Sequence, residues 1–214
     1  MLKTLFRNPL EFDTYILEQK IRMEKGYLTL SEREALKSML DKNYKPIFDK
    51  EEISKGRQII TDINELRKPC LQVEKKEDVK EIIKDLKETL NRIGGLGLTA
   101  NQIGYSKAIS YIKIPKFINK NKEMQFNEYI LINAKIIEKS TPLKVQNEQC
   151  LSFPGISVTT KRYTYITITY LDENFKELTS CSQDLEALAI QHECDHQSGI
   201  VLFDRRYRDV NYRK

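Results

Sequence analysis

Apolar side chains recur every three or four positions between residues 76 and 93, and charged side chains fill the positions between them. A helix turns once in about 3.6 residues, so this spacing gathers the apolar side chains on one face. The pattern therefore predicts an amphipathic helix over Lys76–Ile93. Its predicted buried face consists of Val79, Ile82, Ile83, Leu86, Leu90 and Ile93.

A second helix is predicted near the C-terminal end of the chain. Ser180 and Gln183 have the spacing of a capping box, in which two side chains satisfy backbone N–H groups at the start of a helix. A stripe of side chains with helical spacing follows and indicates one buried face. The stripe consists of Leu185, Leu188, Ala189, His192 and His196.

Four stretches between these helices are rich in Ile, Val, Thr and Tyr, the residues that favour strands. They are Lys107–Ile114, Tyr129–Ile137, Ile156–Thr160 and Tyr163–Leu171. Strands in the middle of the chain and helices toward its ends predict an α+β fold with antiparallel hairpins, not alternating βαβ units.

The N-terminal part of the chain is predicted to form a separate extension. Residues 1–43 have loose helical spacing that fits two short helices, and residues 44–56 are charged and contain proline and glycine, as linkers do. The predicted domains are therefore 1–55 and 56–214. An organellar transit peptide is less favoured, because acidic residues soon follow and such peptides are poor in acids.

The charge pattern narrows the possible partners. Lys and Arg number 36 against 31 Asp and Glu, for a formal net charge of +5, but the two signs are interspersed as on a solvated surface. We therefore expect no specific nucleic-acid partner. No apolar run approaches the roughly 18 residues of a membrane span, and the start of the chain lacks a secretory signal. We expect a cytoplasmic protein without a membrane partner.

The clearest chemistry lies in the H-E-x-x-H motif formed by His192, Glu193 and His196. On a helix, four residues turn through about 400°, so both imidazoles stand on one face and can hold one metal ion. Glu193 lies about 100° round from His192, where a carboxylate can take a proton from water instead of binding the metal. A chance match on a polar helix is the alternative, because the bare motif is short.

The third ligand must be Cys, Asp or Glu, because the chain has no other histidine. Its four cysteines, Cys70, Cys150, Cys181 and Cys194, are too few and too irregularly spaced for a disulfide framework. Cys150 is our candidate, since it lies in a break between strands, Asn147–Gly155, and a thiolate suits Zn²⁺ or Fe²⁺. The alternative for Cys150 is a small buried apolar role. That role is expected for Cys194, which points about 200° away from His192 on a helix.

A glycine-rich loop follows the first predicted helix, with glycines at 94, 95 and 97. Such loops can bind phosphate. This one lacks the third glycine and following helix of a dinucleotide site, and the Gly-Lys-Ser/Thr of a P-loop. A phosphate site is therefore disfavoured.

Three segments together resemble the peptide deformylases: Gly95–Gln102, Glu148–Ser152 and Gln191–His196. They occur in the family's order, and the resemblance covers about residues 56–206. It implies an α+β fold with antiparallel sheets around a central metal-binding H-E-x-x-H helix, preceded here by the N-terminal helical extension. It also implies removal of the formyl group from N-terminal formylmethionine of newly made polypeptides, which releases formate.

The resemblance implies a role for each matching residue. The metal ligands would be Cys150, His192 and His196. Glu193 would be the acid and base, and the amide of Gln102 with the backbone N–H of Leu151 would bind the oxyanion. Substrate-binding roles are expected for Leu96, Gly97, Glu148, Leu185, Leu188 and Ala189. Arg162 matches an arginine that pairs with the residue at position 148 in the family.

The implied cofactor is one divalent metal ion, Fe²⁺ in cells, with Zn²⁺, Ni²⁺ or Co²⁺ also able to function. The implied partners are N-formylmethionyl peptides and the ribosome near its exit tunnel.

This chain departs from the family pattern at three places. Gln149 replaces the usual glycine before the cysteine, which matters if that position needs a positive φ. Thr99 stands where alanine is usual. The sequence ends soon after Tyr207, so we expect no counterpart of the C-terminal helix of many bacterial members.

Two other functions fit parts of the pattern. An endoprotease of the H-E-x-x-H-x-x-G-x-x-H type is matched up to Gly199, but position 202 is Leu instead of the third His. A deformylase-like module kept only for binding is the non-enzymatic alternative, and the intact ligands and Glu193 argue against it.

Overall fold

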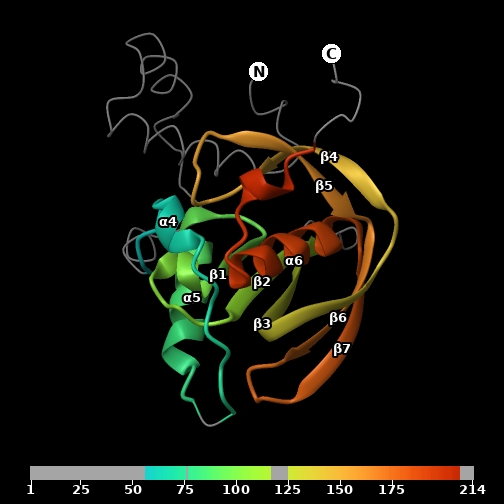
Figure 1. Cartoon of the computed structure of the whole chain (residues 1–214). Coiled ribbons are helices and arrows are strands. Elements are labelled where there is room, and N and C mark those ends of the chain that lie inside the picture. Colours follow the sequence, from blue (N-terminus) through green and yellow to red (C-terminus); the bar gives the residue numbers. More distant parts are fainter. Residues whose placement is uncertain (1–55, 76, 117–124, 208–214) are drawn as a thin grey trace, which may run out of the picture. The chain divides into compact units, whose positions relative to one another are not determined.

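The computed structural model describes residues 56–75, 77–116 and 125–207 (Figure 1). The predicted N-terminal helices and linker lie outside these residues. Residues 56–90 and 95–207 belong to one compact unit. Within the described residues, no helix is both long enough and apolar enough to cross a bilayer.

The first predicted helix is confirmed as α5, Lys80–Ile93, but it begins four residues later than predicted. The backbone N–H of Lys80 donates to the Asp78 carboxylate, which satisfies a donor that the helix itself leaves without a partner. Leu86 and Leu90 on its apolar face are almost fully buried, as the spacing predicted. A short helix, α4, Ile63–Leu66, precedes it.

The strands form two antiparallel sheets (Figure 1). The five-stranded sheet has the order β1 (Gly97–Thr99), β2 (Ile109–Lys116), β3 (Gln125–Lys139), β6 (Tyr165–Leu171) and β7 (Glu177–Gln183). The two-stranded sheet pairs β4 (Pro142–Gln149) with β5 (Ser157–Tyr163). The four predicted strands correspond to β2, β3, β5 and β6, and their antiparallel pairing is confirmed. The sequence did not predict β1, β4 and β7.

The second predicted helix is confirmed as α6, Asp184–Gln197, but its predicted capping box is wrong. Ser180 pairs with Ile168 in the β6–β7 ladder, and Gln183 is the last residue of the same strand. The chain therefore passes directly from strand to helix. Asp184 makes this change of direction with a positive φ of 51°, and its N–H donates to the carbonyl of Thr164.

The five-stranded sheet carries an apolar cluster on each face. Alternate residues of β2 supply both clusters, because successive side chains of a strand point to opposite faces. Ile109 and Tyr111 belong to the cluster that contains the buried face of α5, whereas Ile112 and Ile114 belong to the cluster that contains Ile190 of α6. Helix α6 contacts strands of both sheets.

Candidate functional site

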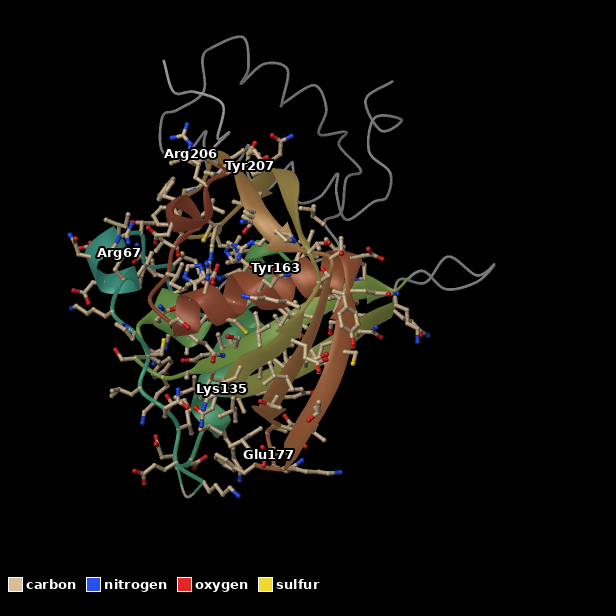
Figure 2. All side chains as sticks on the ribbon, turned by 45° about the vertical axis from the view of Figure 1, so that its right-hand side comes forward. Arg67, Lys135, Tyr163, Glu177, Arg206 and Tyr207 are labelled. Carbon is tan, nitrogen blue, oxygen red and sulfur yellow. The ribbon has the colours of Figure 1, made fainter. Side chains whose placement is uncertain are left out.

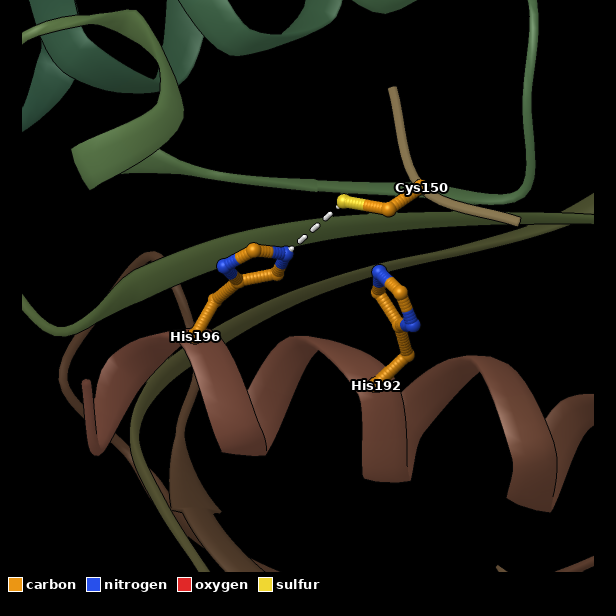
Figure 3. Close-up of side chains that lie close together, drawn as sticks. All are labelled: Cys150, His192 and His196. Carbon is orange, nitrogen blue, oxygen red and sulfur yellow. Dashed lines mark hydrogen bonds between the residues drawn. The ribbon is translucent and has the colours of Figure 1, made fainter. Parts of the chain in front are cut away.

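Helix α6 presents His192 and His196 on one side, and both imidazoles face Cys150 (Figure 3). The Nε2 atom of His196 lies 3.2 Å from the sulfur of Cys150, and one ligand atom from each of the three residues lies within 4.8 Å of the others. Cys150 and His196 are buried and His192 is half-buried. The structure therefore brings together the three residues that the sequence indicated as ligands.

These residues fit a small divalent metal. Ligand atoms about 2.0 to 2.3 Å from a shared tetrahedral centre lie roughly 3.3 to 3.6 Å apart, close to the 3.2 Å between His196 and Cys150. Burial, aided by His192, lowers the pKa of His196 well below its ordinary value. Its imidazole is therefore neutral, which is the form that binds metals.

Cys150 follows the last residue of β4, in a turn that leads back into β5. The N–H of Phe153 donates to the carbonyl of Cys150, and the N–H of Ile156 donates to the carbonyl of Phe153. The preceding Gln149 does not have a positive φ, whereas Asn147 does, at 59°. The usual glycine is therefore not required at position 149 of this chain. The predicted break begins later than expected, since positions 147 to 149 still belong to β4.

Cys194 points away from the site, which agrees with the prediction from its position on the helix. It is buried in the apolar cluster between α6 and the sheet. Burial raises the pKa of the Cys194 thiol to about 12, so the group stays protonated. Cys70 is also buried, and burial raises the pKa of its thiol to about 11.

Glu148 orients one of the candidate ligands. Its Oε1 atom lies 2.8 Å from Nδ1 of His192, and the guanidinium of Arg162 donates to both of its oxygens at 2.5 and 2.9 Å. The hydroxyl of Thr160 also donates to Glu148. Burial opposes ionisation, but the hydrogen bonds from His192 and Arg162 outweigh it and hold the pKa of Glu148 well below its ordinary value. A carboxylate on Nδ1 leaves Nε2 of His192 for the metal.

The Glu148–Arg162 pair implied by the resemblance is thus present, but the sequence did not indicate the contact with His192. A glutamate two residues before a candidate cysteine ligand was the available signal. The substrate-binding role expected for Glu148 stays a prediction.

Arg162 also pairs with a second carboxylate, that of Asp195. It is 2% exposed and donates to Asp195 at 2.5 Å, and Asp195 in turn accepts two hydrogen bonds from Arg205. Burial disfavours the charged guanidinium, but Glu148 and Asp195 outweigh it and raise the pKa of Arg162. Asp195 and Arg205 could not be predicted, because no local pattern shows what the side chain of Arg162 reaches.

Glu193 lies beside the candidate ligands with its carboxylate buried. It is 3% exposed, and the hydroxyl of Thr99 donates to its Oε2 atom at 2.7 Å. The backbone of Gly97 also lies beside the carboxylate, because a Cβ atom added there would lie 2.6 Å from Oε1 of Glu193. Burial raises the pKa of Glu193, although His192 and Thr99 oppose the shift. The structure thus shows why position 97 needs glycine: the space of a side chain is filled by Glu193.

The amide of Gln102 is held toward the cysteine. Gln102 lies in the short 3₁₀ helix η2, Ala100–Ile103, and its Oε1 accepts the N–H of Thr99 at 2.9 Å. Its Nε2 therefore faces the site, 3.1 Å from the hydroxyl of Ser152 and 3.7 Å from the sulfur of Cys150. Leu151 lies between Cys150 and Ser152, with its side chain packed against the cluster on the α5 face.

The residues expected to hold the substrate side chain differ in exposure. Leu185 is 45% exposed, Leu188 is half-buried, and Ala189 is buried in the cluster between α6 and the sheet. Leu96 is partly buried against the same cluster. Their contacts with a substrate stay predictions.

Gln191 attaches α6 to the two-stranded sheet. Its side chain accepts the N–H of Tyr163 at 2.9 Å and donates to the carbonyl of the same residue at 2.7 Å. Figure 2 labels Tyr163 beside the helix, at the end of β5. This attachment, at the residue before His192, fixes the helix relative to the sheet that carries Cys150 and Glu148.

Comparison with known proteins gives a consistent result. A family model described as polypeptide deformylase matches residues 57–211. Peptide deformylases from Microchaete diplosiphon and Aquifex aeolicus are 35% and 33% identical over 141 and 151 residues, covering 65% and 70% of this chain and 73% and 86% of those relatives. The crystal structure of peptide deformylase from Ehrlichia chaffeensis in complex with actinonin matches with a TM-score of 0.63 and 31% identity, covering 72% of this chain and 90% of that one.

Proposed function

The chain belongs to the polypeptide deformylase family, and we propose that the cluster of Cys150, His192 and His196, with Glu193, is the centre of its reaction. The enzyme removes the N-formyl group from newly made polypeptides. The observation that supports this assignment of residues is the convergence of the three ligand atoms within 4.8 Å beside a buried glutamate. In this proposal α6 is the metal-binding helix around which the two sheets are arranged.

When bound by these ligands, a divalent metal supplies Lewis acidity, which strengthens water as an acid and a carbonyl as an electrophile. Glu193 takes one proton from the attacking water. Its Oε1 is the atom for this step, because Oε2 already accepts a hydrogen bond from Thr99 and no hydrogen bond within the described residues reaches Oε1. The oxygen of the water adds to the formyl carbon.

The developing oxyanion accepts hydrogen bonds from Nε2 of Gln102 and the backbone N–H of Leu151. Loss of one such donor typically lowers the rate by about 10² to 10³. Glu193 then gives its proton to the departing nitrogen as the C–N bond breaks. One water is consumed, and the products are formic acid and a free N-terminal amine. The acid ionises to formate, and its proton passes to the amine or to solvent.

Selectivity has two sources in this proposal. A site closed by Gly97 and the Cys150 turn admits hydrogen on the acyl carbon and excludes methyl. The unbranched side chain of methionine lies against Leu96, Leu185, Leu188 and Ala189. A methylene in such a pocket is worth only about 1 to 3 kcal/mol, so selection for methionine is weaker than selection for formyl.

The resemblance also supports finer proposals. Fe²⁺ is the proposed native metal, with Zn²⁺, Ni²⁺ or Co²⁺ as functional replacements. Peptide-like ligands are supported by the actinonin complex of the Ehrlichia chaffeensis relative. Methionine as the first residue, contact with the ribosome near its exit tunnel, and a cytoplasmic location are proposals that follow from the family's role.

Formate release from a formyl-methionyl peptide tests the function. We expect rapid release with metal-loaded protein and scarcely any acetate from the matched acetyl-methionyl peptide. An endoprotease would cleave inside both peptides, and a binding module would cleave neither. Comparable hydrolysis of the two peptides would contradict the proposed site.

A further inference from the structure

The hydroxyl of Thr99 is the first of a buried series of hydrogen-bonding groups behind Glu193. Thr99 faces Ser110 directly across the β1–β2 ladder, and their hydroxyl oxygens are 2.8 Å apart. Thr99 and Ser110 are both fully buried. The Oγ1 atom of Thr99 lies 2.7 Å from Oε2 of Glu193 and 3.3 Å from the backbone carbonyl of the same residue. The shorter distance favours the carboxylate as the acceptor.

Gln197 lies at the other end of this series and determines which group donates and which accepts in each hydrogen bond. Its Oε1 accepts the backbone N–H of Ala134 at 3.2 Å, and its Nε2 donates to the backbone carbonyl of Leu131 at 3.1 Å. A backbone N–H can only donate and a carbonyl can only accept, so these two contacts fix which end of the amide is nitrogen. The same Nε2 lies 2.9 Å from the hydroxyl of Ser110 and donates to it.

The orientation of the Gln197 amide determines where the hydroxyl protons of Ser110 and Thr99 point. Each hydroxyl has one proton, so Ser110, which accepts from Gln197, has its proton available for Thr99. Thr99 accepts that hydrogen bond and directs its own proton to Glu193. An ionised carboxylate accepts only, so both ends of the series require the same direction.

We propose that Thr99 is a positioning residue for deformylation: the series from Gln197 through Ser110 to Thr99 holds Oε2 of Glu193 as a permanent acceptor and leaves Oε1 for proton transfer. This inference rests on the proposed function. Gly97 leaves free the space that the Oε1 side of the carboxylate occupies, since a Cβ atom at position 97 would lie 2.6 Å from Oε1. The hydrogen bond from Thr99 holds the carboxylate in this space, which places Oε1 for the reaction before substrate binds.

The test compares variants of one position in the metal-loaded protein. Thr99→Val keeps the shape and removes the hydroxyl, and Thr99→Ser keeps the hydroxyl. Thr99→Val should lower kcat about 10- to 100-fold, the range expected for one hydrogen bond to a charged group. KM and metal content should not change, and Thr99→Ser should lie within about threefold of wild type.

Thr167→Val is the matched control. Thr167 is also buried and its hydroxyl also donates to a glutamate, Oε2 of Glu138 at 3.0 Å, but on a different part of the sheet. This variant should keep the wild-type kcat. Ser110→Ala in the wild-type background should lower kcat, because the proton of Thr99 loses its fixed direction. Ser110→Ala in the Thr99→Val background should have no further effect.

Several results would overturn the proposal: a wild-type kcat for Thr99→Val, an equal loss in Thr99→Ser, or additive effects of the two substitutions. If Thr99→Val does not fold, Thr99→Ala against Thr99→Ser gives the same contrast. A crystal structure of the hydroxyl-free variant provides a readout without activity, and Glu193 should lose its single position there. If wild-type protein releases no formate, the proposed function fails, and an unmoved Glu193 in that structure separately rejects the role of Thr99.

Discussion

The carboxylate of Glu193 occupies the space that a side chain at position 97 would need, and this predicts a strong effect of one added methyl group. In Gly97→Ala the new Cβ would lie 2.6 Å from Oε1 of Glu193, so the carboxylate must move. A displacement of about 1 Å at reacting atoms costs roughly 10²-fold in rate. We expect kcat/KM to fall by about that factor while metal content stays at the wild-type value. Steady-state formate release and metal analysis measure both.

Gly104→Ala is the control for this substitution. A Cβ atom there meets nothing within 4 Å, but φ is +92°, a conformation that costs a non-glycine residue about 1 to 2 kcal/mol. This variant should lose stability and keep kcat/KM. Wild-type activity in Gly97→Ala would show that the reaction does not need the carboxylate of Glu193 in this position.

Cys150 supplies the only sulfur of the proposed metal site, so its substitution predicts weaker metal binding. A serine hydroxyl keeps the size but is not a thiolate, and the soft ligand is lost. Cys150→Ser should retain less metal than wild type after dialysis against a chelator, whereas exposed Cys181→Ser should retain as much. Equal metal content in Cys150→Ser and wild type would remove Cys150 from the site.

Residue type and helical spacing were sufficient to indicate the two proposed histidine ligands, because His192 and His196 lie one turn apart on a single helix. Because the chain has no other histidine, the third ligand had to be another residue type, and a cysteine was the candidate. Hydrogen bonds between segments distant in sequence could not be predicted in this way. The contact of Thr99 with Glu193 spans 94 positions, and no local pattern shows that β1 lies against α6.

Three strands were not predicted from the sequence, β1, β4 and β7. Each lacks the residue pattern expected of a strand. Strand β1 has only three residues and follows a glycine-rich stretch. Strand β4 is mostly polar, because its two-stranded sheet leaves several of its side chains exposed. Strand β7 contains the serine and glutamine that resembled a helix start. Backbone pairing with β6 decides its conformation, which local propensity does not reveal.

The charges of Arg162, Asp195 and Arg205 connect β5, α6 and the short 3₁₀ helix η3, Leu202–Arg205. Arg162→Met preserves the length of the side chain but leaves the half-buried carboxylate of Glu148 without its arginine and buried Asp195 with Arg205 alone. Breaking a buried pair in this way typically destabilises by about 3 to 5 kcal/mol. We expect a loss of that order in urea unfolding of chelator-treated protein, in which metal binding does not contribute.

Lys68→Met provides the comparison, because the Lys68–Glu65 pair is exposed, with side chains 64% and 54% accessible. Solvent screens such a pair, so its removal should scarcely change stability. Equal stability of the two variants would show that the buried charges do not hold these elements together.

The residues assigned to the reaction all lie between positions 96 and 196, and the family match covers residues 57–211. We therefore predict that deletion of residues 1–44 leaves a folded and active enzyme. Its kcat/KM for a formyl-methionyl peptide should lie within about threefold of the value for the full chain. A threefold change corresponds to less than about 1 kcal/mol of transition-state stabilisation. A truncated protein that is folded and metal-loaded yet inactive would place part of the active site in the deleted segment.

Glu193 is assigned to proton transfer, and Cys150, His192 and His196 are assigned to metal binding. One variant separates these two roles. Glu193→Gln removes the base and keeps the size of the side chain. Wild type and variant, loaded with the same metal, should contain equal metal per chain. The kcat of the variant for formate release from a formyl-methionyl peptide should be lower by about 10² to 10⁴, the usual contribution of general acid–base catalysis. A metal-loaded Glu193→Gln enzyme with wild-type turnover, or one that loses its metal, would contradict this division of roles.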